Sequence, residues 1–260
     1  MAVLFWLLHY GDPSMNSAMT HRSPATALAA TRQLCEAVFE ANIALVRAGL
    51  AMDTFGNASG ILRASGPSSL VAIKPSGMPY DKLRPESMVL VTLDGEVVEG
   101  SLRPSTDLPT HLALYRAFPA IGGVAHTHSH YATVFAQAGR EIPCFGTTHA
   151  DYFYGPVPVT EPLIAGTIQD DYELNTGREI VRRFEVLNPQ AMPAVLVQGH
   201  APFCWGASPA EAAHNAWMLE EAARLAFHTL QVNPAARPIA KELLDKHFLR
   251  KHGAGRYYGQ

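Results

Sequence analysis

Residues 122–137 read GGVAHTHSHYATVFAQ, and this stretch decides the fold class. The segment from Gly122 to His126 is short and apolar, as is typical of a buried β-strand bounded by glycine. A helical pattern begins after Ser129, only a few residues further on. Because a strand is followed so closely by a helix, and the rest of the chain mixes the two in the same way, the sequence predicts an α/β protein.

The remaining elements are predicted from hydrophobic spacing and cap signals. Apolar residues recur at helical intervals over 25–50, and further helices are predicted from near Asp107 and from Ser208, where Ser-Pro-Ala-Glu is a typical helix start. Strands are predicted at 70–73, 88–93 and 194–198. No repeat or linker divides residues 25–260, so we predict a single domain there. Residues 1–24 lack a sustained pattern and are predicted to be a disordered extension or a misassigned start.

Composition excludes several classes of protein. Twenty Lys plus Arg against 23 Asp plus Glu give a formal charge of −3, which provides no basic surface for a nucleic acid. The apolar run 2–8 is too short to cross a bilayer and lacks the features of an export signal. Cys35, Cys144 and Cys204 are odd in number and widely spaced, which predicts reduced thiols and a cytoplasmic location.

Histidines supply the clearest chemical signal. His126 and His128 lie two residues apart at a strand end, so their side chains are predicted to point to the same side and to converge on one metal ion. His130 is a weaker candidate because a helix is expected there. His200, after the strand 194–198, and Asp107 are further candidate ligands. Imidazole with carboxylate favours Zn²⁺, with Mn²⁺ or Co²⁺ as alternatives; simple packing of the histidines is the other interpretation.

Three short segments are built from Gly, Ser, Thr and Asn together with Pro, Lys or Asp, at 55–60, 74–77 and 104–107, and the first two contain glycine. Backbone N–H groups at such turns, with neighbouring hydroxyls, can form a concave site for a phosphate, and Lys74 would add positive charge. Ordinary turn chemistry is the alternative for each of them. None matches a Walker loop or a dinucleotide fingerprint, so nucleotide binding is not predicted.

Two regions carry candidate acids and bases. Asp151 lies among the aromatic residues of 146–155, an environment expected to raise the pKa of its carboxyl group towards a useful range. A structural hydrogen-bond acceptor is the alternative role. The C-terminal tail, 245–260, is basic and aromatic, and Tyr258 beside its cations is a candidate proton donor, although such tails are usually frayed.

Over residues 27–260 these segments resemble the class II aldolase/epimerase family. The resemblance is carried by GNASG (56–60), IKPSG (73–77), PSTDLPTH (104–111), AHTHSHYAT (125–133), GTTHADYFYG (146–155), QGHAPFCWG (198–206) and the tail 245–260. Two positions depart from the family pattern, with Phe55 where tryptophan is usual and Thr106 where a second serine is common.

The resemblance implies a fold and a role for each matching residue. The implied fold is a three-layer α/β/α sandwich with a mixed, largely antiparallel central sheet. Asp151 and Tyr258 match the acid/base pair, with the tyrosine coming from a neighbouring subunit of a homotetramer whose active sites lie at subunit interfaces. The matching metal ligands, normally holding zinc, are Asp107, His126, His128 and His200. The matching substrate contacts are Gly56, Asn57, Lys74, Ser76, Gly77, Ser105 and Thr106, with His247 and Arg250 in the tail near the same site.

The activity implied is a metal-dependent inversion of C4 in a phosphorylated ketopentose, from L-ribulose 5-phosphate to D-xylulose 5-phosphate, through cleavage and re-formation of the C3–C4 bond. The alternative is a class II aldolase acting on a sugar phosphate such as L-fuculose 1-phosphate. Those aldolases have a glutamate at the position of Asp107, so the shorter aspartate and the tail favour the epimerase. A non-catalytic protein of the adducin-head type would lack the metal ligands that this chain carries.

Overall fold

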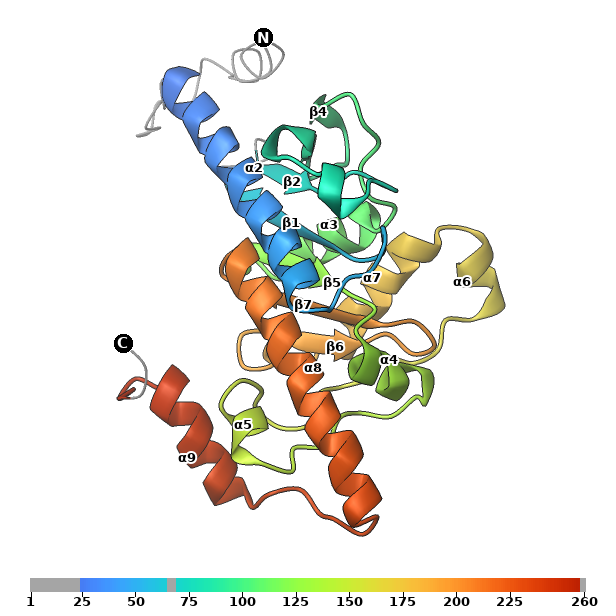
Figure 1. The fold of residues 1–260 in the computed structure, drawn as a ribbon, viewed down its shortest axis with the longest axis vertical. Coiled ribbons are helices and arrows are strands. Elements are labelled where there is room, and N and C mark those ends of the chain that lie inside the picture. Colours follow the sequence, from blue (N-terminus) through green and yellow to red (C-terminus); the bar gives the residue numbers. More distant parts are fainter. Residues whose placement is uncertain (1–23, 65–68, 258–260) are drawn as a thin grey trace.

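The computed structural model describes residues 24–64 and 69–257, in which seven strands form one sheet (Figure 1). Their order is β4-β3-β2-β1-β5-β7-β6, and all pairings between these strands are antiparallel. The strands are β1 (Asn57–Leu62), β2 (Leu70–Ile73), β3 (Val89–Thr92), β4 (Val97–Glu99), β5 (Gly123–His126), β6 (Ala194–Leu196) and β7 (Pro202–Gly206). The predicted α/β class and the largely antiparallel central sheet are therefore confirmed.

Helices cover both faces of this sheet. On one face α2 packs on β1 and β2 while α8 packs on β5 and β7, and on the other face α3 packs against α7 (Figure 1). Helix α4 packs against α8, and α5 lies between α8 and α9. The helices are α2 (Pro24–Arg47), α3 (Leu108–Ala117), α4 (His130–Gln137), α5 (Thr147–Ala150), α6 (Ala165–Gln169), α7 (Tyr172–Arg183), α8 (Pro209–Val232) and α9 (Lys241–His252), with short 3₁₀ turns η2 (Tyr80–Lys82) and η3 (Pro85–Ser87).

Three glycines let the start of α8 approach the sheet closely. Gly60, Gly123 and Gly206 lie side by side across β1, β5 and β7. A Cβ atom on Gly60 would lie 2.6 Å from the ring of Pro209, and one on Gly123 would lie 2.4 Å from the backbone nitrogen of Pro209. Side chains at these positions would therefore push the helix away from β5, the strand that ends at His126.

The sequence predicted several of these elements and missed others. The helices predicted over 25–50 and from Ser208 are present as α2 and α8, and the Ser208 side chain accepts a hydrogen bond from the Glu211 backbone N–H at 3.2 Å. The segment 55–60 was predicted to be a turn, which is wrong for 57–60, because these residues form the start of β1. The elements missed are β4, β7, α5, α6, α7 and α9.

Three expectations concern the start of the chain, the membrane and the cysteines. The prediction for residues 1–24 falls almost entirely outside the described residues, which begin at Pro24. None of the helices in the described ranges combines the length and the apolar character needed to cross a bilayer. The three cysteines, Cys35, Cys144 and Cys204, are free thiols as expected.

Candidate metal centre and active site

Three histidines converge at the ends of neighbouring strands. His126 is the last residue of β5, His128 follows two residues later, and His200 lies in the turn between β6 and β7. One nitrogen of each imidazole lies within 4.8 Å of one nitrogen of each of the others. Their ring centroids are separated by 4.9 to 5.0 Å. The predicted convergence is therefore present, and His130, the weaker candidate, is exposed at the start of α4 outside this cluster.

Outer contacts orient two of these rings. The Nδ1 atom of His126 lies 2.9 Å from the carbonyl oxygen of Pro202, to which it donates, so Nε2 keeps its lone pair for a metal ion. The same ring stacks on Phe203, its partner in the β5–β7 register, at 4.2 Å between centroids. The Nδ1 atom of His200 lies 3.2 Å from the hydroxyl of Tyr172, which leaves Nε2 as a ligand when Nδ1 carries the proton.

Burial keeps two of the imidazoles neutral. It lowers the pKa of His200 to about 4, with the neighbouring His126 and His128 acting in the same direction. Burial and His126 also lower the pKa of His128. A neutral imidazole offers the lone pair that a metal ion requires. The donor set and its protonation therefore fit a divalent cation.

Asp107 lies beside this cluster. It precedes α3, yet its side chain makes no cap hydrogen bond to that helix. Instead its Oδ2 atom accepts a hydrogen bond of 2.7 Å from Asn57, the residue paired with His126 across β1 and β5. Burial alone would raise the pKa of the Asp107 carboxyl group, but His126, His111 and the Asn57 hydrogen bond outweigh it and lower the pKa. The carboxylate is thus ionised and close to the histidines, although it is not one of the three clustered donors.

The three segments predicted to bind an anion lie next to one another. The Ser76 backbone N–H donates to the carbonyl oxygen of Arg103 at 2.9 Å, and the Ser105 N–H donates to that of Lys74 at 3.0 Å, so the segments 74–77 and 104–107 are joined. The Asn57 amide donates to the Ser105 hydroxyl at 3.1 Å, which connects the turn before β1 to the same group. Gly56 and Gly77 have positive φ values of 80° and 64°. Thr106 is exposed next to Ser105 in this group.

Lys74 is buried beside these turns. Its ammonium group donates to the carbonyl of Thr54 at 3.3 Å and lies 4.8 Å from the centre of the Tyr80 ring. Burial lowers the pKa of Lys74, although the charges of Asp107 and Asp53 act in the opposite direction. The Tyr80 hydroxyl in turn donates to the carbonyl of Gly56 at 2.8 Å. The Lys74 ammonium group therefore lies beside the residues that precede Gly56, within reach of the carbonyl oxygens of Thr54 and Pro75.

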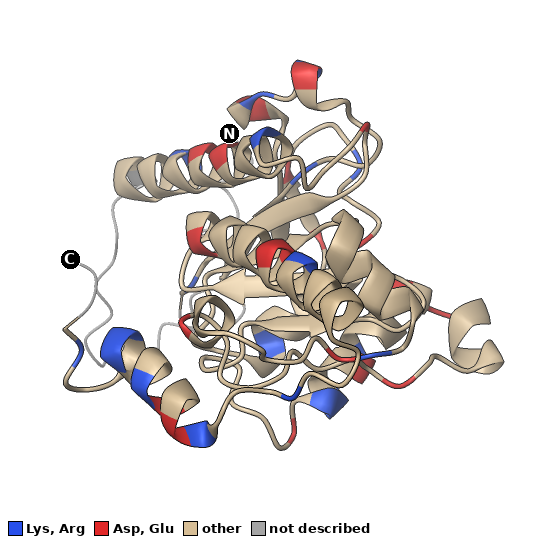
Figure 2. Ribbon diagram, turned by 60° about the horizontal axis from the view of Figure 1, so that its bottom comes forward, with Lys and Arg blue, Asp and Glu red and all other residues tan. Residues whose placement is uncertain are grey.

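Asp151 belongs to a second cluster of charged residues. It follows α5, and its carboxylate accepts hydrogen bonds from Arg250 at 2.7 and 3.1 Å, with His247 Nδ1 at 3.1 Å. Burial would raise the pKa of Asp151, but the hydrogen bonds from Arg250 and His247 outweigh it and lower the pKa. The expectation of a raised pKa is therefore wrong, because α9 brings a guanidinium group to the carboxylate. Figure 2 shows the Lys and Arg residues of α9.

Helix α8 contacts an element next to each cluster, namely α4, which follows His128, and α5, which precedes Asp151. Figure 1 shows α5 and α9 on one side of α8, and α4 on its other side. The groups that shift the pKa of Asp151 all lie in the tail, whereas Asp107 is influenced by the histidines. The structure thus does not bring Asp151 and its tail partners, His247 and Arg250, to the histidine cluster of the same chain. Tyr258 lies outside the described residues.

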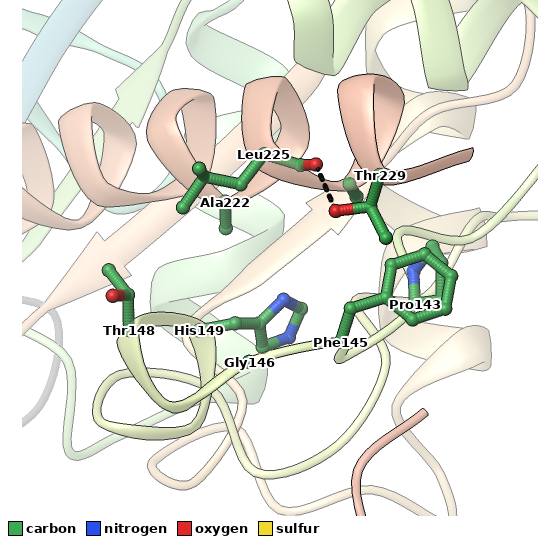
Figure 3. A pocket seen from close by; sticks show the side chains of 9 residues that line it. Pro143, Phe145, Gly146, Thr148, His149, Ala222, Leu225 and Thr229 are labelled. Atoms are coloured by element: carbon green, nitrogen blue, oxygen red, sulfur yellow. Dashed lines mark hydrogen bonds between the residues drawn. The ribbon is translucent and has the colours of Figure 1, made fainter. Parts of the chain in front are cut away.

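A pocket of about 190 Å³ lies beside α5, under α8 (Figure 3). His149 borders it, and its Nε2 atom lies 2.8 Å from the carbonyl oxygen of Gly155, to which it donates. Burial lowers the pKa of His149 to about 4. The pocket includes none of the clustered histidines, and the Gly155 contact fixes the segment that follows Asp151. Its lining residues are Pro143, Phe145, Gly146, Thr148, His149, Ala222, Leu225, Ala226 and Thr229.

Sequence reasoning missed a buried polar group behind the histidine cluster. The Ser59 hydroxyl lies 2.7 Å from His111 Nδ1 and 2.8 Å from the Tyr115 hydroxyl, joining β1 to α3. Burial lowers the pKa of His111 to about 3. The spacing of four residues from Asp107 to His111 on a helix was a signal that these two residues share a face. Tyr172, the partner of His200, had no comparable signal.

The fold and the histidine cluster define a class of protein. Residues 36–227 match the family described as Class II Aldolase and Adducin N-terminal domain, and the chain belongs to this family. Among solved structures, an L-fuculose 1-phosphate aldolase has a TM-score of 0.69 at 22% identity, covering 83% of this chain and 94% of that chain. YgbL from Klebsiella pneumoniae has a TM-score of 0.64 at 28% identity, covering 83% and 98%.

Two curated relatives are more similar to this chain in sequence than these solved structures are, and they have the same name. L-ribulose-5-phosphate 4-epimerase UlaF of Salmonella paratyphi B is 49% identical over 229 residues, which cover 88% of this chain and 99% of the relative. The protein of the same name from Salmonella paratyphi C is also 49% identical over the same share of both chains. The resemblance inferred from the sequence motifs is confirmed by these relatives.

Proposed function

We propose that this chain interconverts L-ribulose 5-phosphate and D-xylulose 5-phosphate by inverting C4. The observation that carries the proposal is the cluster of His126, His128 and His200 in a chain that matches curated epimerases over 99% of their length. The substrate is a small phosphorylated ketopentose, and neither a nucleic acid nor a membrane is a partner. The three free thiols and the sugar-phosphate substrate support a cytoplasmic location.

The cofactor is a divalent metal ion, with zinc as the first choice. Three imidazoles and the carboxylate of Asp107 form a donor set that suits Zn²⁺, with Mn²⁺ or Co²⁺ as alternatives. When bound, such an ion supplies Lewis-acid stabilisation of negative charge on the substrate oxygens, worth several kcal/mol in general. Asn57 holds the Asp107 carboxylate at 2.7 Å, so the fourth donor is oriented by the same strand pair that positions His126.

The substrate phosphate is held by the group of joined turns. The N–H groups of Ser76 and Ser105 join the turns to one another, so the hydroxyls, the remaining backbone N–H groups and the buried Lys74 ammonium are the donors that favour a dianion. The residues assigned to this contact are Gly56, Asn57, Lys74, Ser76, Gly77, Ser105 and Thr106, which the hydrogen bonds between the turns support. Firm retention of the phosphate is needed because the cleaved fragment must turn over without leaving.

The inversion proceeds by cleavage of the C3–C4 bond, because C4 carries no acidic hydrogen. Cleavage gives a dihydroxyacetone enediolate and glycolaldehyde phosphate, and re-addition to the other face of the aldehyde inverts C4. The Asp151 carboxylate and the Tyr258 hydroxyl take and return the C4 hydroxyl proton on opposite faces. The Asp151 carboxylate is ionised at neutral pH, as a proton acceptor must be, but its lowered pKa makes it a weaker base than an unpaired carboxylate. His247 and Arg250 hold that carboxylate and lie near the same substrate.

The catalytic unit is a homotetramer in which Asp151 and Tyr258 serve the metal centre of a neighbouring chain. Support comes from the elements next to these residues: α5, which Asp151 follows, lies with α9 on one side of α8, whereas α4, which begins two residues after His128, lies on the other side. Two inactive variants test this arrangement. Co-expression of His126→Asn with Asp151→Asn restores activity if the two groups act across an interface, because some sites then combine both intact halves. If Asp151 acts within its own chain, no mixture recovers activity.

A product assay tests the reaction itself. Purified protein with L-ribulose 5-phosphate is expected to yield D-xylulose 5-phosphate, detected by a coupled enzyme, and a chelator is expected to stop the reaction. Release of free glycolaldehyde phosphate without D-xylulose 5-phosphate would instead identify an aldolase. A protein that forms tetramers but binds no divalent metal ion would indicate the adducin-like alternative.

A further inference from the structure

The three clustered histidines differ in what orients their rings. His126 donates to Pro202 and His200 contacts Tyr172, so each has an outer partner. The ring of His128 has no hydrogen bond within the described part of the chain, and its nearest aromatic neighbour outside the cluster is Phe55 at 5.7 Å. Outer partners of metal-binding histidines contribute strongly to metal affinity. The position of His128 must therefore depend on the backbone that carries it.

That backbone is fixed at the start of α4, two residues after His128. Ser129 occupies the cap position, but its side chain makes no cap hydrogen bond. The Ser129 hydroxyl is buried without a partner in the described residues. The cap is supplied by Glu220 of α8, which accepts the backbone N–H groups of Tyr131 at 2.8 Å and of Ala132 at 3.0 Å. Each carboxylate oxygen takes one N–H group.

We propose that Glu220 is a positioning residue for the metal centre. Its carboxylate ties the segment from His128 to α4 onto α8, so that the His128 imidazole faces those of His126 and His200. A negative charge at a helix N-terminus and two charge-assisted hydrogen bonds both favour this attachment. The inference rests on the proposed metal site and adds a residue that contacts neither the metal ligands' rings nor the substrate.

The test compares Glu220→Gln with Glu221→Gln in the full-length protein. Glutamine keeps the size of the side chain but loses the charge and one of the two acceptors. Glu221, the next residue on α8, is the matched control because its carboxylate pairs with Arg224 on the same helix, at 2.8 Å. The probe is Zn²⁺ itself, titrated into metal-free protein in competition with a coloured chelator. Co²⁺ absorption reports the geometry around the bound ion.

Glu220→Gln is expected to weaken Zn²⁺ binding by about 10-fold or more and to change the Co²⁺ spectrum, as outer positioning residues generally do. Glu221→Gln is expected to match the wild type in both. Thermal unfolding of the metal-free proteins separates stability from affinity. Equal Zn²⁺ affinity and an unchanged Co²⁺ spectrum in Glu220→Gln overturn the inference, even if that variant is less stable.

Two further outcomes are distinguishable. If the wild-type protein binds neither ion, the proposed metal site fails, and the inference fails with it. If Glu220→Gln does not fold, Glu220→Asp takes its place, since aspartate keeps the charge but shortens the reach. A smaller loss of Zn²⁺ affinity is then expected, and affinity equal to that of the wild type overturns the inference.

Discussion

Gly123→Ala tests whether the close approach of α8 to the sheet is needed for stability. A Cβ atom there would lie 2.4 Å from the Pro209 nitrogen, 2.5 Å from its Cα atom and 2.5 Å from the Ser208 carbonyl carbon. Ordinary contacts begin at 3.4 Å, so the helix start and β5 must separate by about 1 Å. Overpacking of this kind generally costs about 1–3 kcal/mol, and the upper end applies because backbone atoms collide and no side chain can rotate away.

A loss of about 3 kcal/mol corresponds to a fall in Tm of roughly 6–12 °C for a protein of this size. Thermal unfolding followed by circular dichroism measures it. Gly166→Ala is the matched control, because a Cβ atom on Gly166 meets nothing within 4 Å and the residue lies in helix α6. Its Tm is expected to stay the same or to rise, since alanine favours a helix over glycine. A decrease in Tm of less than about 2 °C for Gly123→Ala would refute the packing argument.

Three other changes test the site. Asp151→Asn is expected to abolish epimerisation with metal content intact, because Asp151 contacts the tail and not the histidine cluster; loss of metal in elemental analysis would contradict this. Chelation is expected to stop product formation, and added Zn²⁺ to restore it; full activity in a verified metal-free preparation would contradict a metal-dependent route. Burial lowers the pKa of His149 to about 4 from an ordinary 6.5, so the unfolded chain binds a proton that the native protein excludes, and stability rises with pH between these values. His149→Gln should reduce this dependence of the unfolding free energy on pH by up to about 1.4 kcal/mol per pH unit. The unfolding free energies of the wild type and the variant are measured by urea unfolding at pH 5 and pH 6. The same change between the two pH values in both proteins would contradict the assignment.

The histidine cluster could be predicted because its signals are local. His126 and His128 are two residues apart at a strand end, and His200 follows another apolar strand. Residues at the ends of two strands come together when the strands are neighbours in one sheet. Here β5 pairs with β7, which begins two residues after His200. Local spacing therefore carried most of the information.

The β1 strand could not be predicted from its own residues. Asn, Ser and two glycines around positions 56–60 favour a turn by intrinsic preference. The structure places 57–62 in the middle of the sheet because β2 and β5 pair with both edges of this segment. Gly60 is also required where Pro209 approaches. Tertiary packing outweighs local preference at this position.

The direction of the pKa shift of Asp151 could not be predicted from the sequence. Its partners His247 and Arg250 are 96 and 99 residues away in sequence. The aromatic residues around Asp151 suggested burial, which does act to raise its pKa. The packing of α9 against α5 brings cationic side chains to this region, and Lys251 lies 4.0 Å from the centre of the Tyr152 ring. The effect of these cations on the pKa of Asp151 outweighs that of burial. A pKa depends on the sum of neighbours in space, and a sequence reveals few of them.

The two groups of site residues are oriented by separate parts of the fold. Strand register and Glu220 set the histidine cluster, through β1, β5, β7 and α4. The contact of α9 with α5 sets Asp151. Since α8 touches both α4 and α5, it is the element through which a change on one side can reach the other. A helix connects two sites mainly by moving as a rigid body. Substitutions that do not move α8 should therefore affect either the histidine cluster or Asp151, and not both. Metal affinity and proton transfer are therefore separable properties of this chain.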